Sequence, residues 1–127
     1  MKGTKDITFL LVDDELSILQ SLENILKSHE FHVILASNVT EALQKLKLFR
    51  VDVCITDFNM PGGTGLDLIE KIRADNRRMN LPIILYSGSI SEGAQAKISA
   101  YPFVQVLAKP ASIDRLMDLI QRALNPR

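Results

Sequence analysis

The stretch CITDFNMPGGTG, residues Cys54 to Gly65, runs from an apolar segment into a turn built on Pro61 and two glycines. One carboxylate, Asp57, stands where the apolar segment ends. A short apolar run followed by such turn residues predicts a buried strand and the loop behind it. An isolated Asp in this place commonly starts the turn by hydrogen bonding to its own backbone. A functional role for Asp57 therefore depends on residues from elsewhere in the chain.

Short apolar runs rich in β-branched residues recur along the chain and predict five strands. The predicted strands are Ile7–Val12, His32–Ala36, Val51–Thr56, Pro82–Ser87 and Phe103–Ala108.

Between these runs, apolar residues recur with the helical period. The stripes are Leu16, Leu19, Leu22 and Leu26; Ala42, Leu43 and Leu46; Leu66, Ile69 and Ile72; and Ile113, Leu116, Met117 and Ile120. Asn38 with Glu41 resembles a capping box, and Ser112 or Ala111 follows Pro110 where the last helix would begin. The segment from 91 to 100 has a weaker stripe, which Gly93 interrupts, and is also predicted as a helix.

Alternating strands and helices of this kind predict an open α/β sandwich, because parallel strands need crossover helices that cover both faces of the sheet. No repeat or linker divides residues 1–127, which are therefore expected to form one domain. Ligands of such sheets bind beyond the carboxyl ends of the strands. The residues directly after each strand are therefore the candidates for function.

Composition excludes several classes of protein. Fifteen basic and 15 acidic residues give a formal net charge of zero, with no Lys/Arg stripe that could follow a phosphate backbone, so direct nucleic-acid binding is not expected. The single Cys54 cannot form an internal disulfide, and no apolar run approaches the roughly 20 residues that span a bilayer. Residues 1–6 lack the apolar stretch of a secretory signal. These features predict a cytoplasmic protein without membrane contact.

The residues at the predicted strand ends form a coherent chemical set. Asp13 and Asp14 follow the first strand, Asp57 the third, Ser87 ends the fourth and Lys109 follows the fifth. Neighbouring carboxylates repel by about 4 kcal/mol at about 4 Å with an effective dielectric near 20, so they call for a cation, and oxygen ligands favour Mg²⁺ or Mn²⁺. A hydroxyl and an ammonium beside that metal would complement a phosphoryl group. Asp57 is then a candidate nucleophile for phosphoryl transfer.

The sequence resembles the receiver domains of two-component response regulators, in particular the chemotaxis regulators. The resemblance covers nearly the whole chain and rests on the motifs LLVDDE, ITDFNMPGGTGLDLI, LYSGS and LAKPAS in this order. It implies a flavodoxin-like fold with strand order 2-1-3-4-5, which would bring the first and third strands together.

The resemblance also implies roles for the individual residues. Asp57 would accept the phosphoryl group, Asp14 would ligate Mg²⁺ directly, and Asp13 would act largely through metal-bound water. The main-chain carbonyl of Asn59 would complete the metal ligands. Ser87 would hydrogen bond to a phosphoryl oxygen, and Lys109 would pair with its charge.

The implied partners are a sensor histidine kinase or a histidine phosphotransfer protein, and a downstream effector or output domain. Receivers often carry Tyr or Phe three residues before this Lys, whereas Val106 stands here. The resemblance implies that this ring turns inward when the hydroxyl at the end of the fourth strand moves toward the phosphoryl group. The short, stiff side chain of Val106 cannot make that movement. We therefore expect phosphorylation to act through the predicted fourth helix and to change a partner face formed by that helix, the fifth strand and the last helix.

Two other functions remain open. A haloacid-dehalogenase-like phosphohydrolase also uses an Asp nucleophile with Mg²⁺, but its acid/base Asp two residues later is replaced here by Asn59. A receiver-like adaptor that is never phosphorylated would not need the complete set of strand-end residues. A nucleotide-binding domain is disfavoured, because no glycine-rich phosphate loop follows the first strand.

Several other residues have structural interpretations. Cys54 is expected in the core, Glu15 as a solvated acid in the first turn of a helix, and Thr64 as a helix cap. His29 and His32 are expected at the surface, without a metal.

Overall fold

A computed structural model of the chain describes residues 6–125. The expectations for residues 1–5 and for the end of the chain at 126–127 lie outside the described residues. The described strands are β1 (Thr8–Val12), β2 (His32–Ala36), β3 (Val53–Thr56), β4 (Ile83–Ser87) and β5 (Val104–Ala108). They form one parallel sheet in the order β2-β1-β3-β4-β5, which confirms the expected α/β fold and strand order.

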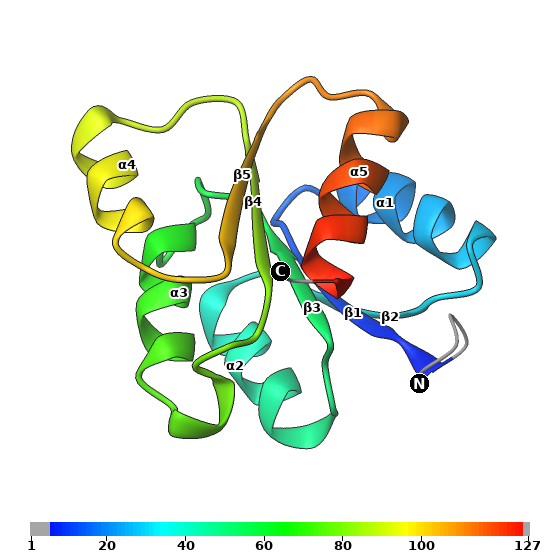
Figure 1. Cartoon of the computed structure of the whole chain (residues 1–127), viewed down its shortest axis with the longest axis horizontal. Helices are drawn as coiled ribbons and strands as arrows, with labels where there is room; N and C mark the ends of the chain where they lie inside the picture. Colours follow the sequence, from blue (N-terminus) through cyan, green and yellow to red (C-terminus); the bar gives the residue numbers. More distant parts are fainter. Residues whose placement is uncertain (1–5, 126–127) are drawn as a thin grey trace.

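The helices lie on both faces of the sheet (Figure 1). They are α1 (Leu16–Ser28), α2 (Val39–Leu48), α3 (Gly65–Arg73), the short 3₁₀ helix η2 (Asn76–Arg78), α4 (Glu92–Ser99) and α5 (Ile113–Leu124). Figure 1 shows α1 and α5 on one face and α2, α3 and α4 on the other. The segment from 91 to 100, which has the weakest sequence pattern, thus does form a helix.

Two hydrophobic cores lie on either side of the sheet, because successive strand residues point to opposite faces. Phe9 and Leu11 of β1 pack with α1 and α5, whereas Leu10 and Val12 pack with α2 and α3. Cys54 belongs to the second core and is fully buried, as expected.

Two apolar residues assigned to the helical stripes do not enter the core. Leu16 and Ile113 are 63% and 54% exposed, and each is the first residue of its helix. Both residues lie in the predicted helices, but a first-turn position lies beyond the end of the packed stripe. The stripes begin instead at Leu19 and Leu116.

Helix caps follow the sequence in part. Asn38 accepts a hydrogen bond from the Glu41 amide, which is one half of the expected capping box, but the Glu41 carboxylate accepts from Ser37. A complete capping box forms instead at the start of α3, between Thr64 and Asp67.

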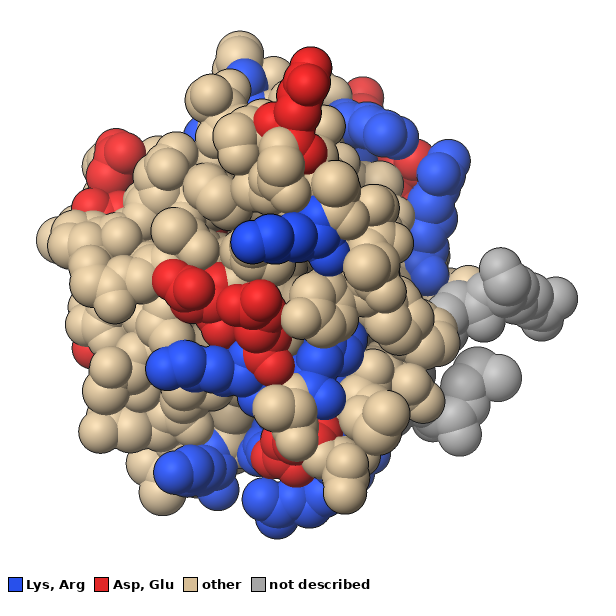
Figure 2. All heavy atoms as spheres, turned by 90° about the vertical axis from the view of Figure 1, so that its left-hand side faces the viewer, with Lys and Arg blue, Asp and Glu red and all other residues tan. Residues whose placement is uncertain are grey.

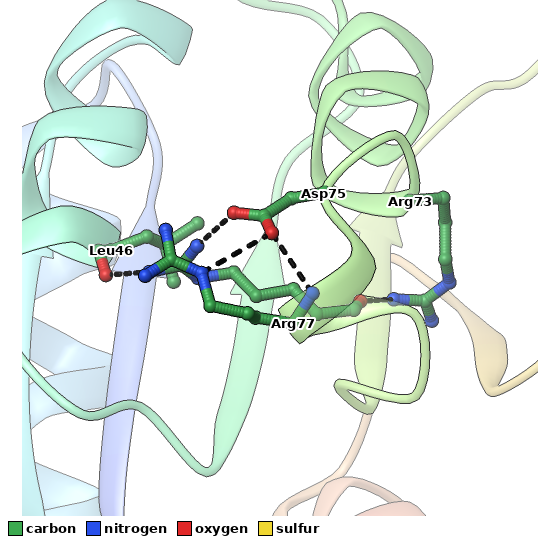
Figure 3. Close-up of polar contacts among 5 residues, drawn as sticks. Leu46, Arg73, Asp75 and Arg77 are labelled. Carbon is green, nitrogen blue, oxygen red and sulfur yellow. Dashed lines mark hydrogen bonds and ion pairs between the residues drawn. The ribbon is translucent and has the colours of Figure 1, made fainter.

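Polar contacts fix the end of the molecule remote from the strand-end residues. Asp75 accepts a hydrogen bond from the Arg77 amide at 2.9 Å and pairs with Arg78, whose guanidinium also donates to the Leu46 carbonyl at the end of α2 (Figure 3). Arg73 donates to the main-chain carbonyls of residues 78, 81, 102 and 103. These contacts hold the segments that lead into β4 and β5.

The surface carries mixed charge. Figure 2 shows acidic and basic side chains interspersed over the face on which α3 and α4 lie. No helix among residues 6–125 is long and apolar enough to cross a membrane.

Candidate functional site: an acidic cluster at the strand ends

Asp13 and Asp57 are brought together by the pairing of β1 with β3. Val12 lies opposite Thr56 in the parallel register, so the next residue of each strand reaches the same edge of the sheet. The Asp57 amide donates to the Val12 carbonyl at 2.9 Å, which extends the ladder one residue past β3. The two carboxylates therefore stand on rigid backbone.

Asp14 completes a cluster of three carboxylates. One oxygen of each of Asp13, Asp14 and Asp57 lies within 4.8 Å of the others. Asp13 and Asp57 are buried, at 3% and 7% exposure, whereas Asp14 is exposed. Oxygen-only ligands at this spacing suit a hard divalent cation such as Mg²⁺.

Lys109 supplies the positive charge of the cluster. Its Nζ lies 3.5 Å from Oδ2 of Asp13 and 3.6 Å from Oδ1 of Asp57. The backbone places it there, because the Lys109 amide donates to the Ser87 carbonyl at 3.0 Å and continues the pairing of β4 with β5.

The environment of Asp13 opposes its ionisation. Burial raises the pKa of the Asp13 carboxyl, and the neighbouring carboxylates of Asp57 and Asp14 raise it further. A hydrogen bond from the Glu15 amide and the charge of Lys109 lower the pKa in part, but burial dominates. One ammonium thus does not balance three acids, so the cluster is short of positive charge.

The other residues expected in the site differ in their surroundings. Ser87 is buried, and its hydroxyl lies 3.5 Å from the Ser89 carbonyl, at the upper limit of a hydrogen bond. Asn59 is exposed in the loop between β3 and α3. Asp57 itself accepts a hydrogen bond from the Phe58 amide at 2.8 Å.

Two neighbours of the cluster were not found by sequence reasoning. The Tyr86 ring lies beneath Lys109 Nζ, which is 5.1 Å from the ring centroid. Gly65 packs against the backbone of Asp57 and Phe58. The available signals were an aromatic residue directly before the strand-end Ser87 and a glycine directly after the helix cap Thr64.

The other residues with structural interpretations lie at the surface or in the core. Glu15 is exposed, as expected, but it is the N-cap residue of α1 and not a first-turn acid, and its side chain makes no capping bond. His29 and His32 are both exposed and lie outside the acidic cluster. Burial raises the pKa of the Cys54 thiol to about 12. Val106 is 44% exposed on the edge strand β5.

Comparison with known proteins gives one consistent result. The family profile described as the response regulator receiver domain matches residues 9–121. Among curated proteins, the chain is 33% identical over 119 residues to the chemotaxis protein CheY of Pseudomonas aeruginosa, covering 89% of this chain and 92% of that protein. It is 36% identical over 119 residues to the response regulator protein PilR of the same organism. That match covers 93% of this chain but only 26% of PilR.

Solved structures agree with the sequence matches. A response regulator receiver protein from Pseudomonas putida superposes with a TM-score of 0.87 at 29% identity, covering 96% of this chain and 99% of the other. The chemotaxis response regulator CheY4 of Vibrio cholerae superposes with a TM-score of 0.84 at 30% identity, covering 93% and 98% of the two chains.

Proposed function

This chain belongs to the response regulator receiver domain family, and from that premise we propose that it is a switch turned on by phosphorylation of Asp57. Receiver domains are signalling switches and not conventional enzymes. The observation that carries the proposal is the position of Asp57: a buried carboxylate at a strand end, 3.6 Å from the Lys109 ammonium and within 4.8 Å of two further acids. We propose that residues 1–127 form one such domain.

The phosphodonor is a phosphohistidine of a histidine kinase or phosphotransfer protein. An Asp57 oxygen attacks the phosphorus, a P–O bond forms as the P–N bond breaks, and the imidazole leaves with the electron pair. The Lys109 ammonium faces the charge that gathers on the phosphoryl oxygens. The Ser87 hydroxyl, whose contact to the Ser89 carbonyl is long, is free to turn toward a phosphoryl oxygen.

The acidic cluster fits a Mg²⁺ or Mn²⁺ ion. Asp13, Asp14 and Asp57 offer only oxygen atoms and carry three acidic groups beside the single ammonium of Lys109, so a divalent cation would offset their charge. These three carboxylates and the main-chain carbonyl of Asn59 would hold the metal. When bound, it would offset the negative charge of the carboxylates and the phosphoryl group during transfer.

The partner face consists of α4, β5 and α5. Among the described residues of α4, only Ile98 is buried, so this helix is weakly anchored. Val106 on β5 is 44% exposed. We infer that phosphorylation shifts α4 and thereby changes binding of a separate effector or of an output domain, and that the protein acts in the cytoplasm.

Intact mass spectrometry after incubation with Mg²⁺ and acetyl phosphate tests the proposal. We expect the wild-type protein to gain the mass of one phosphoryl group and Asp57→Asn to gain none. Asp118→Asn is the matched control, because Asp118 is an exposed acid of α5. A phosphoryl mass that persists in Asp57→Asn would reject Asp57 as the acceptor, and a wild-type protein that never gains it would reject the function.

A further inference from the structure

Tyr86 makes an aromatic contact with the only cation of the candidate site among the described residues. Lys109 Nζ lies over the Tyr86 ring, 5.1 Å from its centroid. Cation–π attraction operates within about 6 Å of the centroid, where the negative face of the ring meets the positive charge. The contact therefore links a residue of β4 with no role in the proposed chemistry to one that faces Asp57.

The strand register explains why this contact forms. Tyr86 lies directly opposite Leu107 in the parallel pair of β4 and β5. Side chains two residues apart on a strand share a face, so Lys109 follows Leu107 on the side of the sheet where Tyr86 stands. The hydrogen bond from the Lys109 amide to the Ser87 carbonyl keeps this register past the end of β5.

The carboxylates alone do not hold the ammonium closely. Its distances of 3.5 and 3.6 Å to Asp13 and Asp57 exceed the roughly 2.7–3.2 Å of a hydrogen bond. Only 20% of the Lys109 side chain is exposed, so little water is available to fix its position. The Tyr86 ring gives the ammonium a further contact besides these two ion pairs.

Tyr86 contacts Lys109 through its ring and not through its hydroxyl. Within residues 6–125, the Tyr86 hydroxyl takes part in no hydrogen bond given by the structure, whereas the ring packs partly buried against the core shared with α1 and α5. An aromatic residue without the hydroxyl should therefore serve equally well.

We propose that Tyr86 is a positioning residue for phosphoryl transfer: its ring holds the Lys109 ammonium beside the Asp57 carboxylate. The proposal rests on the proposed function of Asp57. Replacing the aromatic ring with an aliphatic side chain should leave the Lys109 ammonium less firmly placed beside Asp57. Phosphoryl transfer to Asp57 should then be slower.

The first experiment compares phosphorylation rates with acetyl phosphate and Mg²⁺ for Tyr86→Phe, Tyr86→Leu and Tyr101→Leu. Tyr101 is the only other tyrosine of the chain and lies after α4, so its replacement controls for the loss of one ring. We expect the wild-type rate for Tyr86→Phe and Tyr101→Leu, and a rate about fivefold lower for Tyr86→Leu, since about 1 kcal/mol corresponds to that factor.

The second experiment separates electrostatics from packing. Phenylalanines with one, two or three fluorine atoms, placed at position 86, nearly keep the ring's shape while weakening its negative face. The rate should fall stepwise with each fluorine, and the upfield ring-current shift of the Lys109 ε-methylene protons should persist throughout the series. A purely structural role would leave the rate unchanged across it.

The outcomes distinguish the two proposals. A phosphorylated wild-type protein with equal or faster rates in Tyr86→Leu and in the fluorinated variants would overturn the role of Tyr86 alone. Absence of the ring-current shift in the wild-type protein would also overturn it. A wild-type protein that is never phosphorylated would instead overturn the function of Asp57, while the ring-current shift could still establish the contact.

Discussion

A Cβ atom at position 65 would lie 2.6 Å from the main-chain carbonyl oxygen of Asp57. It would also lie 2.6 Å from Cδ1 of Leu85, and the Gly65 amide donates to the Phe58 carbonyl at 2.8 Å. Gly65 therefore lets α3 begin directly against the end of β3. The path of the loop after Asp57 therefore depends on the absence of a side chain at position 65.

The first prediction is that Gly65→Ala destabilises the protein by about 1–3 kcal/mol, since the backbone of residue 57 cannot yield without disturbing the end of β3. Urea denaturation measures the change. Gly93→Ala is the matched control, because a Cβ atom there meets nothing within 4 Å and sits in the helix α4. That variant should gain up to about 1 kcal/mol, as alanine favours helix. Equal stability of both variants would contradict this interpretation.

The second prediction concerns Asp13 in Mg²⁺-free buffer. Because the folded-state pKa of Asp13 is raised above 3.8, the folded protein binds more protons than the unfolded chain, and stability falls as pH rises through the raised pKa. Asp13→Asn should remove this decline and so stabilise the metal-free protein at neutral pH relative to acid pH, although it also removes the attraction to Lys109. Thermal unfolding from pH 4 to pH 8 measures it. A variant as pH-sensitive as the wild type would refute the assignment to Asp13.

The third prediction ranks the metal ligands. Asp13 already accepts a hydrogen bond from the Glu15 amide and faces Lys109, whereas Asp14 is exposed and makes no contact of these kinds with the described residues. Asp14 has more freedom to bind a metal directly, so Asp14→Ala should weaken Mg²⁺ binding more than Asp13→Ala. Isothermal titration of the unphosphorylated proteins gives the ranking, and equal losses would count against it.

The fourth prediction concerns the response to phosphorylation. Val106 has a short, stiff side chain and cannot reorient as an aromatic ring would. We therefore expect the conformational change on phosphorylation in residues 88–100, where α4 buries only Ile98. Hydrogen exchange should change severalfold in this segment when beryllofluoride, a phosphoryl mimic, is added with Mg²⁺. Unchanged protection there, with changes confined to other elements, would reject this path.

The sequence predicts most of the fold because strand and helix periods are local. It also predicts that Asp13, Asp57 and Lys109 meet, since each ends or follows a strand of one parallel sheet. It does not predict the contact of Tyr86 with Lys109, which depends on the register between two strands and on a side-chain direction. The helical period also includes Leu16 and Ile113, which are exposed, because it does not mark where the packed part of a stripe starts.

The hydrogen bonds of the Arg73 guanidinium could not be predicted from the sequence pattern. Its acceptors are main-chain carbonyls, whose positions depend on the complete fold. Three of those carbonyls, of residues 81, 102 and 103, lie just before β4 and just after α4. Hydrogen bonds from Arg73 thus hold the chain just after the C-terminal end of α4. The N-terminal end of α4 is connected to the sheet through the loop that follows Ser87. A displaced α4 would accordingly pivot about its C-terminal end, and its N-terminal end would move furthest.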